Sequence, residues 1–298
     1  MTPLKICVVC NFTDTKCGIA NFGHQTVTAL TRAGHAVTAF DGTYPEVYRR
    51  REAGIDPFLP PDIATYDVLH LIWHAITLNH YMGVEWQHLH PHPIRSFWDC
   101  GPSDAYCPFD EWFPVKWMLY PRDGYHSMDY PVPDWVHALG DPDPGFVVGA
   151  SSVRGDGVAE LRAVCEAEGW AMNLPTPDRW LSIEDEIRRL ARSTVNVCWY
   201  NSGATWKDRA SAPSMLIAST RPILINHDDL VAHLWDRQDL YHGQIHLTND
   251  ARGLGPALRE IHHDWRQGLL RRPIDTYRQL MWKTAAARMT QVWQEARG

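Results

Sequence analysis

The sequence has 298 residues, of which 45% are hydrophobic and 21% charged, and this composition excludes a mainly disordered chain. The formal net charge of −7 excludes a surface that is basic all over, although it leaves room for a local basic groove. No run of about 20 apolar residues occurs, so we expect no membrane span. Because the N-terminus has no signal-peptide pattern and the seven cysteines form no paired framework, we expect a cytoplasmic protein.

The first half of the chain alternates strands with helical and loop segments. Residues 5–10 form a short apolar run typical of a buried strand, Gly18 opens a helical stretch, and residues 36–41 predict the next strand. This strand–helix–strand order indicates a right-handed crossover within a parallel sheet. Further strands are expected in this half at 67–73, 93–98 and 116–120.

A proline-rich stretch at 129–145 predicts a linker, beyond which the pattern restarts. Strands are expected at 146–149, 170–174, 194–200, 222–226 and 244–247. After a loop at 150–157, helices are expected up to Glu168 and at 183–192, 214–219, 230–235, 254–268 and 275–297. We therefore predict an α/β protein with two Rossmann-like, doubly wound parallel-sheet domains, namely residues 1–140 and 141–274, and a C-terminal helix at 275–298.

Three segments carry motifs in a characteristic order: CGIA at 17–20, SAPSMLIASTRPIL at 211–224 and MWKTAAARMTQVW at 281–293. Together they resemble the GT-B superfamily of glycosyltransferases, in particular the family 4 type. The resemblance implies two domains that face a cleft, a nucleotide diphosphate sugar as substrate, no cofactor, and a last helix that crosses back to the first domain. Two glutamates common in that family are replaced by Lys207 and Met215, so the resemblance does not imply a retaining mechanism.

The resemblance assigns donor binding to the second domain, where a metal-free site must neutralise a diphosphate. Backbone N–H groups at a helix start and basic side chains provide that neutralisation. The helix start at Ser214, preceded by Ser211, offers such N–H groups, and Arg154 and Arg209 supply positive charge. Lys207 is a third cation. Ordinary solvated surface charge is the alternative interpretation of all three cations.

The first domain is expected to supply the acceptor side. Asp99, at the end of a predicted strand, is our candidate for the base that takes the proton of the acceptor hydroxyl, and His74 is the second candidate. The alternatives are a turn-capping role for Asp99 and a structural role for His74. Gly18 lacks a Cβ, so a phosphate or sugar can approach its backbone, unless it serves only a tight turn.

No metal site is predicted. His88, His90 and His92 alternate as in a metal-binding strand, but Pro91 and Pro93 interrupt the pattern and no acidic residue lies close by.

The leading interpretation is a glycosyltransferase that moves a sugar from its nucleotide diphosphate donor to a hydroxyl of a glycan, lipid or metabolite. One alternative is a phage-type enzyme that glycosylates hydroxymethylated bases in DNA, with a flipped base stacked on Trp98 or Trp112. The other is a catalytically inactive sugar-nucleotide-binding module. A nicotinamide oxidoreductase is disfavoured, because the chain lacks the G-x-G-x-x-G fingerprint.

Overall fold

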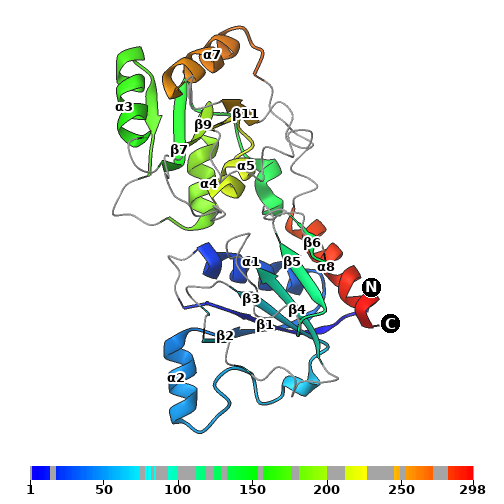
Figure 1. The fold of residues 1–298 in the computed structure, drawn as a ribbon. Helices are drawn as coiled ribbons and strands as arrows, with labels where there is room; N and C mark the ends of the chain where they lie inside the picture. The colour runs from blue at the N-terminus through cyan, green and yellow to red at the C-terminus, as the bar shows by residue number, and fades with distance from the viewer. Residues whose placement is uncertain are drawn as a thin grey trace. The chain divides into compact units, whose positions relative to one another are not determined.

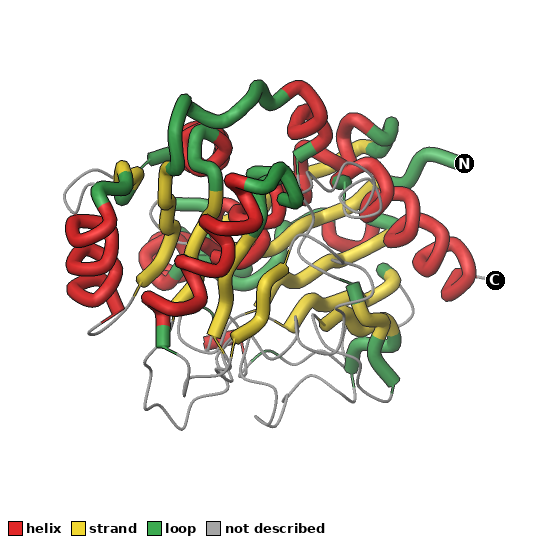
Figure 2. Tube along the Cα trace, turned by 90° about the horizontal axis from the view of Figure 1, so that it is seen from above, coloured by secondary structure: helices red, strands yellow, loops and turns green. Residues whose placement is uncertain are grey.

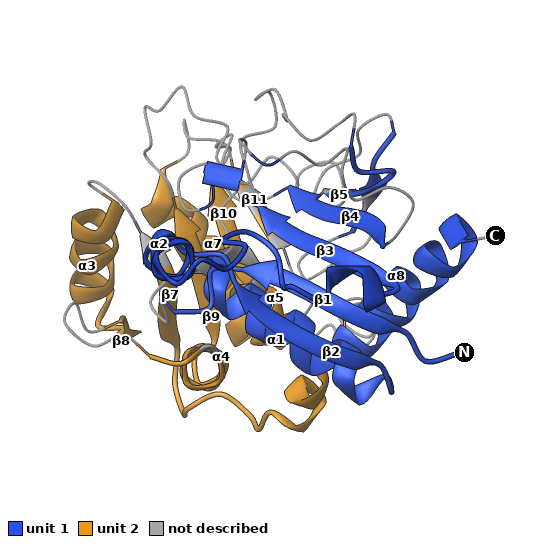
Figure 3. Ribbon diagram, turned by 90° about the horizontal axis from the view of Figure 1, so that it is seen from below, with its two compact units in different colours: residues 1–129, 282–298 blue, residues 130–281 orange. Residues whose placement is uncertain are grey.

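The computed structural model describes residues 2–13, 18–73, 78, 80–81, 84, 93–99, 112–118, 124–128, 133–153, 157–175, 181–199, 212–226, 245–248, 253–270 and 281–297. The chain divides into two compact units, residues 1–129 with 282–298 and residues 130–281 (Figure 3). Each unit contains one sheet whose described strand pairs are all parallel. The predicted α/β class with two Rossmann-like sheets is therefore confirmed. In the described ranges no helix is long and apolar enough to cross a membrane.

The sheet of the first unit has the order β2-β1-β3-β4-β5-β6. Its strands are β1 (Lys5–Cys10), β2 (Ala36–Asp41), β3 (Val68–Trp73), β4 (Ile94–Asp99), β5 (Val115–Met118) and β6 (His126–Ser127). Every residue of β3 is buried, as expected for a central strand covered on both faces. The five strands predicted for this half are present, whereas the two-residue strand β6 was not predicted.

Two helices, α1 (Gly18–Arg32) and α8 (Trp282–Arg297), cover one face of this sheet (Figure 1). Phe22 of α1 lies against Trp98 of β4, with ring centroids 4.8 Å apart. The approach of α1 to β1 requires Gly23, because a Cβ there would lie 2.7 Å from Cys10 Sγ. Helices α1 and α8 thus pack side by side on the same sheet, although they are far apart in the sequence.

Helix α2 (Tyr44–Glu52) lies on the opposite face of the first sheet (Figure 1). The sequence did not predict it, because only Val47 of its nine residues is buried and no apolar periodicity results. Helix α8 also differs from expectation. It begins at Trp282, and residues 275–280, which were expected to form its first turns, lie outside the described residues.

The sheet of the second unit has the order β11-β10-β9-β7-β8. Its strands are β7 (Val147–Val153), β8 (Ala171–Asn173), β9 (Val195–Trp199), β10 (Ile223–Asn226) and β11 (Ile245–Thr248). One face packs against α3 (Gly157–Glu168) and α7 (Leu254–Arg266), and the other against α4 (Ile183–Ala191) and α5 (Ala212–Ala218). Figure 2 shows the helices in red and the strands in yellow, viewed from above. The helix expected at 230–235 lies outside the described residues.

Two predictions in this part of the chain are wrong. The stretch 129–145 is not a plain linker, because it contains a 3-10 helix, Asp134–Ala138. Val136 and Leu139 are buried in the core of the second unit, so two apolar residues spaced three apart are enough to anchor this proline-rich segment. The loop expected from residue 150 begins later, since β7 continues to Val153.

Candidate functional site

In open parallel sheets, ligands bind beyond the carboxyl ends of the strands, at the point where the strand order reverses. In the second unit this point lies between β7 and β9, because β8 follows β7 on one side and β9 lies on the other. The two strands pair up to their last residues, with Val153 beside Trp199. The segments 154–156 and 200–211 therefore leave the sheet from neighbouring positions.

These two segments contain most of the donor-site residues predicted from the sequence. Arg154 directly follows β7, and Lys207, Arg209 and Ser211 lie between β9 and α5. All four lie outside the described residues, so their roles stay predictions. The described strand ends that flank them do lie side by side, which a shared ligand site requires.

Helix α5 begins at Ala212, two residues before the predicted start, so Ser214 is its third residue. Its C-terminal end is fixed to β9. The Ser219 hydroxyl accepts a hydrogen bond from Asn196 Nδ2 at 3.0 Å and donates to the carbonyl oxygen of Leu216 at 2.5 Å. As in any α-helix, the backbone N–H groups of the first turn of α5 have no partner within the helix, and this turn follows directly on the segment after β9.

Strand β7 has an irregularity just before the loop that follows it. Ala150 pairs with Val197 and Ser152 with Cys198, so Ser151 is an extra residue, as in a β-bulge. A bulge bends its strand and increases the local twist, and bulges are common next to active sites. The bulge at Ser151 therefore bends β7 two residues before its end at Val153.

In the first unit the strand order reverses between β1 and β3. Gly18 is the first residue of α1, in the connection after β1, and His74 directly follows β3. His74 lies outside the described residues. The sheet therefore brings the connections that carry Gly18 and His74 to one switch point, as a binding site at this edge requires.

Asp99 is the last residue of β4, and only 2% of its surface is exposed. In the register of the sheet it lies beside Trp73 of β3 and Met118 of β5. Asp99 is thus a buried carboxyl group at the carboxyl edge of the sheet. Asp99 ends β4 and His74 directly follows the neighbouring strand β3, so the two predicted catalytic residues belong to adjacent strand ends.

His80 belongs to the same unit and was not singled out from the sequence. Its Nε2 lies 2.7 Å from the carbonyl oxygen of Gly42, and since a carbonyl can only accept, Nε2 carries the proton. Burial, aided by the charge of Arg50, lowers the pKa of His80 against the opposing effect of the Gly42 hydrogen bond. The ring is therefore neutral at pH 7, with Nδ1 as a basic nitrogen. As one of 16 histidines, His80 carries no distinguishing sequence signal.

One proposed aromatic contact is contradicted by the structure. Trp98 is 1% exposed and stacks inside the core on Trp117, with ring centroids 6.3 Å apart. A nucleobase therefore cannot stack on Trp98. Trp112 is only partly buried, packs against the core on the other face, and stays a prediction.

In the part of the chain that the structure describes, no group of three or more His, Cys, Asp or Glu side chains is arranged to hold a metal ion. His88, His90 and His92 lie outside that part.

No protein-family model and no curated protein matches the chain. Solved structures do match it over nearly its whole length. An alpha-glucosyltransferase in complex with UDP and a 13-mer DNA containing an HMU base has a TM-score of 0.61 at 9% identity, covering 98% of this chain and 99% of that one. The glycosyltransferase of kitacinnamycin has a TM-score of 0.58 at 13% identity, with coverages of 98% and 99%.

The third similar structure is the Anabaena protein HepE in complex with UDP-glucose, with a TM-score of 0.55 at 10% identity and coverages of 98% and 100%. At such identities the likeness concerns the fold. The resemblance found in the sequence motifs is confirmed at that level: the chain has the GT-B fold, the two-domain Rossmann-like architecture of the first two structures, which are glycosyltransferases.

Proposed function

We propose that the protein is a glycosyltransferase that moves a sugar from a nucleotide diphosphate sugar to an acceptor hydroxyl. One observation carries the proposal. The cations and the helix start suited to a diphosphate fall in two segments that leave the second sheet at its switch point, from the paired residues Val153 and Trp199. The similar structures with bound UDP or UDP-glucose support the same assignment.

In this proposal the second unit binds the donor. Arg154 and Arg209 neutralise the diphosphate, and Ser211, Ser214 and the backbone N–H groups of the first turn of α5 donate hydrogen bonds to it. The site needs no metal ion and no cofactor, because these groups balance the charge of the leaving nucleoside diphosphate.

The first unit supplies the proton acceptor. In an inverting transfer, the acceptor oxygen bonds to the anomeric carbon as the bond from that carbon to the diphosphate oxygen breaks. The hydroxyl proton passes to a base, for which Asp99 is the first candidate and His74 the second. His80 is a third candidate on structural grounds, since its Nδ1 is basic while Nε2 is held by Gly42.

A hydroxymethylated base in DNA is the second candidate acceptor. The observation that favours it is the likeness to the alpha-glucosyltransferase whose structure contains DNA with an HMU base. A glycan, lipid or small metabolite is the first candidate. Transfer assays with DNA that contains hydroxymethylated bases, run beside sugar acceptors, separate the two.

Donor binding by Arg154→Ala and Arg209→Ala tests the proposal. A panel of UDP-, GDP-, ADP- and dTDP-sugars first identifies the donor, which stabilises the protein against heat. Each variant loses a charge-assisted hydrogen bond worth about 1.5–3 kcal/mol, so the donor Kd should rise about tenfold or more. The melting temperature of the free protein should stay unchanged.

Arg259→Ala is the matched control. Arg259 lies on α7 in the same unit and makes an exposed ion pair with Glu168 at 2.9 Å. Unchanged donor binding in both Arg154→Ala and Arg209→Ala would contradict the assignment. Slow release of nucleoside diphosphate in the absence of acceptor distinguishes an enzyme from an inactive sugar-nucleotide-binding module.

A further inference from the structure

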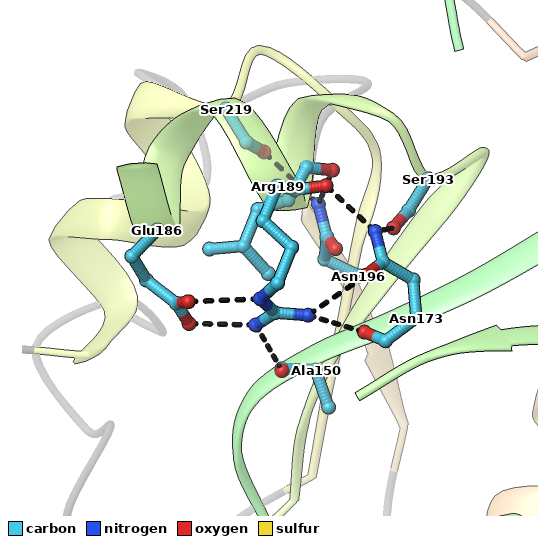
Figure 4. Close-up of polar contacts among 8 residues, drawn as sticks. Ala150, Asn173, Glu186, Arg189, Ser193, Asn196 and Ser219 are labelled. Atoms are coloured by element: carbon cyan, nitrogen blue, oxygen red, sulfur yellow. Dashed lines mark hydrogen bonds and ion pairs between the residues drawn. The ribbon is translucent and has the colours of Figure 1, made fainter. Parts of the chain in front are cut away.

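Arg189 of α4 lies at the centre of a largely buried polar cluster beside the end of β8 (Figure 4). Its Nε donates to Glu186 Oε2 at 2.8 Å, and Nη2 donates to Glu186 Oε1 at 2.6 Å and to the carbonyl oxygen of Ala150 at 2.8 Å. Nη1 donates to Asn173 Oδ1 at 3.2 Å and to the carbonyl oxygen of Asn173. A guanidinium has five N–H donors, so every donor of Arg189 has a partner within the protein.

Asn173 also donates hydrogen bonds, one of them to the backbone of Arg189. Asn173 Nδ2 donates to the carbonyl oxygen of Arg189 at 2.6 Å and to Ser193 Oγ at 3.1 Å (Figure 4). The side chains of Arg189 and Glu186 are only 14% and 11% exposed. A buried ion pair with complete hydrogen bonding resists rearrangement, because removing either partner leaves a buried charge unpaired. The cluster therefore holds α4, β7 and β8 in one fixed arrangement.

The position of the cluster along β7 gives it a consequence for the loop that follows. Strand β8 ends at Asn173, which pairs with Gly149, whereas β7 continues for four more residues to Val153. Arg189 binds Ala150, the first residue of β7 beyond the described pairing with β8. The next residue, Ser151, is the bulge. The guanidinium thus binds β7 just beyond the last residue that pairs with β8, at the point where β7 bends.

We propose that Arg189 is a positioning residue of the donor site. By holding Ala150 it fixes the bulge at Ser151, and with it the end of β7 at Val153, beside Trp199, where the proposed donor site begins. This inference rests on the proposed function, because it needs the donor at the carboxyl edge of the second sheet. Arg189 itself touches no substrate, since its five donors are occupied.

A second buried arginine of the same unit provides a matched control. Arg221 is 4% exposed and donates from Nε to the carbonyl oxygen of Ala191 at 2.7 Å and from Nη2 to that of Gly140. It precedes β10, so it lies at the amino edge of the sheet, opposite the proposed donor site. Lysine in place of either arginine keeps the positive charge but loses the planar fork of donors.

The experiment compares Arg189→Lys and Arg221→Lys with the wild type. Melting temperatures are measured first, and UDP, GDP, ADP and dTDP are then titrated by calorimetry at a temperature where circular dichroism shows all three proteins folded. Both variants should melt earlier. Only Arg189→Lys should weaken binding of the preferred nucleotide, by about tenfold or more, the loss expected when a charge-assisted contact such as that of Arg154 is misplaced.

Equal nucleotide affinity in the wild type and Arg189→Lys, or equal weakening in both variants, would overturn the inference while leaving the proposed function intact. A wild type that binds none of the four nucleotides would overturn both. If Arg189→Lys does not fold, Asn173→Ala takes its place, because it removes two hydrogen bonds that orient Arg189 toward Ala150 and leaves the Arg189–Glu186 pair. It should raise the Kd several-fold, and unchanged affinity would count equally against the inference.

Discussion

Asp99 combines a buried carboxyl group with a place at the end of a parallel strand, where substrates of such folds bind. Asp99→Asn preserves its size and its capacity for hydrogen bonds but removes its ability to accept a proton. If Asp99 is the base, transfer should fall by about 10²–10⁴ while donor affinity persists. The rate of sugar transfer and the donor Kd, measured on the same preparation, check this.

The stereochemistry of the product independently tests whether Asp99 is the base. An inverting enzyme needs a base opposite the leaving diphosphate, whereas in a retaining one the departing phosphate accepts the proton. NMR of the product reads the anomeric configuration. A retained anomer together with near-normal turnover in Asp99→Asn would leave Asp99 with a structural role only. The same assay on His80→Asn tests the third candidate base.

His70 predicts how the stability of the first unit depends on pH. It is fully buried on β3, with Nδ1 3.0 Å from Ser96 Oγ, and burial lowers its pKa from 6.5 to about 3. As the pH falls below about 6.5, the unfolded chain binds a proton that the folded protein does not. The free energy of unfolding is therefore highest above that pH. It falls toward pH 3 by up to about 1.4 kcal/mol per pH unit.

His70→Asn removes this titration, so the difference in melting temperature between pH 7.5 and pH 5 should shrink in the variant. An unaltered pH dependence in His70→Asn would show that His70 does not cause the loss of stability. Calorimetric melts at the two pH values provide the measurement.

At the scale of single elements, the contact between β7 and the turn after α4 depends on Gly149. A Cβ on Gly149 would lie 2.2 Å from Ser193 Oγ and 2.3 Å from Asn196 Oδ1. Gly149→Ala should therefore destabilise the second unit by about 1–3 kcal/mol, the usual cost of overpacking. Urea unfolding curves measure the change in the free energy of unfolding.

Gly140→Ala is the corresponding control, because no heavy atom lies within 4 Å of a Cβ at Gly140. Its stability should stay within about 0.5 kcal/mol of the wild type. Equal effects of the two substitutions would mean that the close approach of Ser193 and Asn196 to Gly149 does not affect the stability of the second unit.

The elements differ in how far the sequence predicts them, and the reason is the range of the contacts that form them. Strands β1 and β2 begin and end at the predicted residues, because each is a short apolar run bounded by turn residues. Helix α2 has no such pattern. The contact from Arg189 to Ala150 joins residues 39 positions apart, and the bulge in β7 forms against the distant strand β9, so no local periodicity encodes either of them.

For the whole molecule, the sequence motifs predicted the fold and indicated which connections carry the candidate site. The sequence could not show that Val153 and Trp199 end side by side, because that depends on the register of the sheet. Nor could it distinguish Trp98, which is buried, from Trp112, which is partly exposed, since both lie among aromatic residues. Burial is a property of the assembled unit.

The whole protein should also work without a divalent metal. If Arg154, Arg209 and the start of α5 neutralise the diphosphate, turnover should persist in excess EDTA. Initial rates with and without the chelator, for the donor found by the nucleotide-sugar panel, give the result. Complete loss of turnover that Mn²⁺ or Mg²⁺ restores would refute metal independence.

Helix α8 makes the first unit discontinuous, and this affects the order in which the ribosome completes the two units. Trp293 of α8 is fully buried beside His70, with ring centroids 5.5 Å apart, so the first sheet lacks part of its cover until α8 has been made. The 152 residues of 130–281 are translated in between, which takes about 8 to 30 s at about 5–20 residues per second. The nascent second unit can therefore finish folding first. Until α8 has been synthesised, the apolar face of β3 and β4 that α8 covers stays exposed and accessible to chaperones.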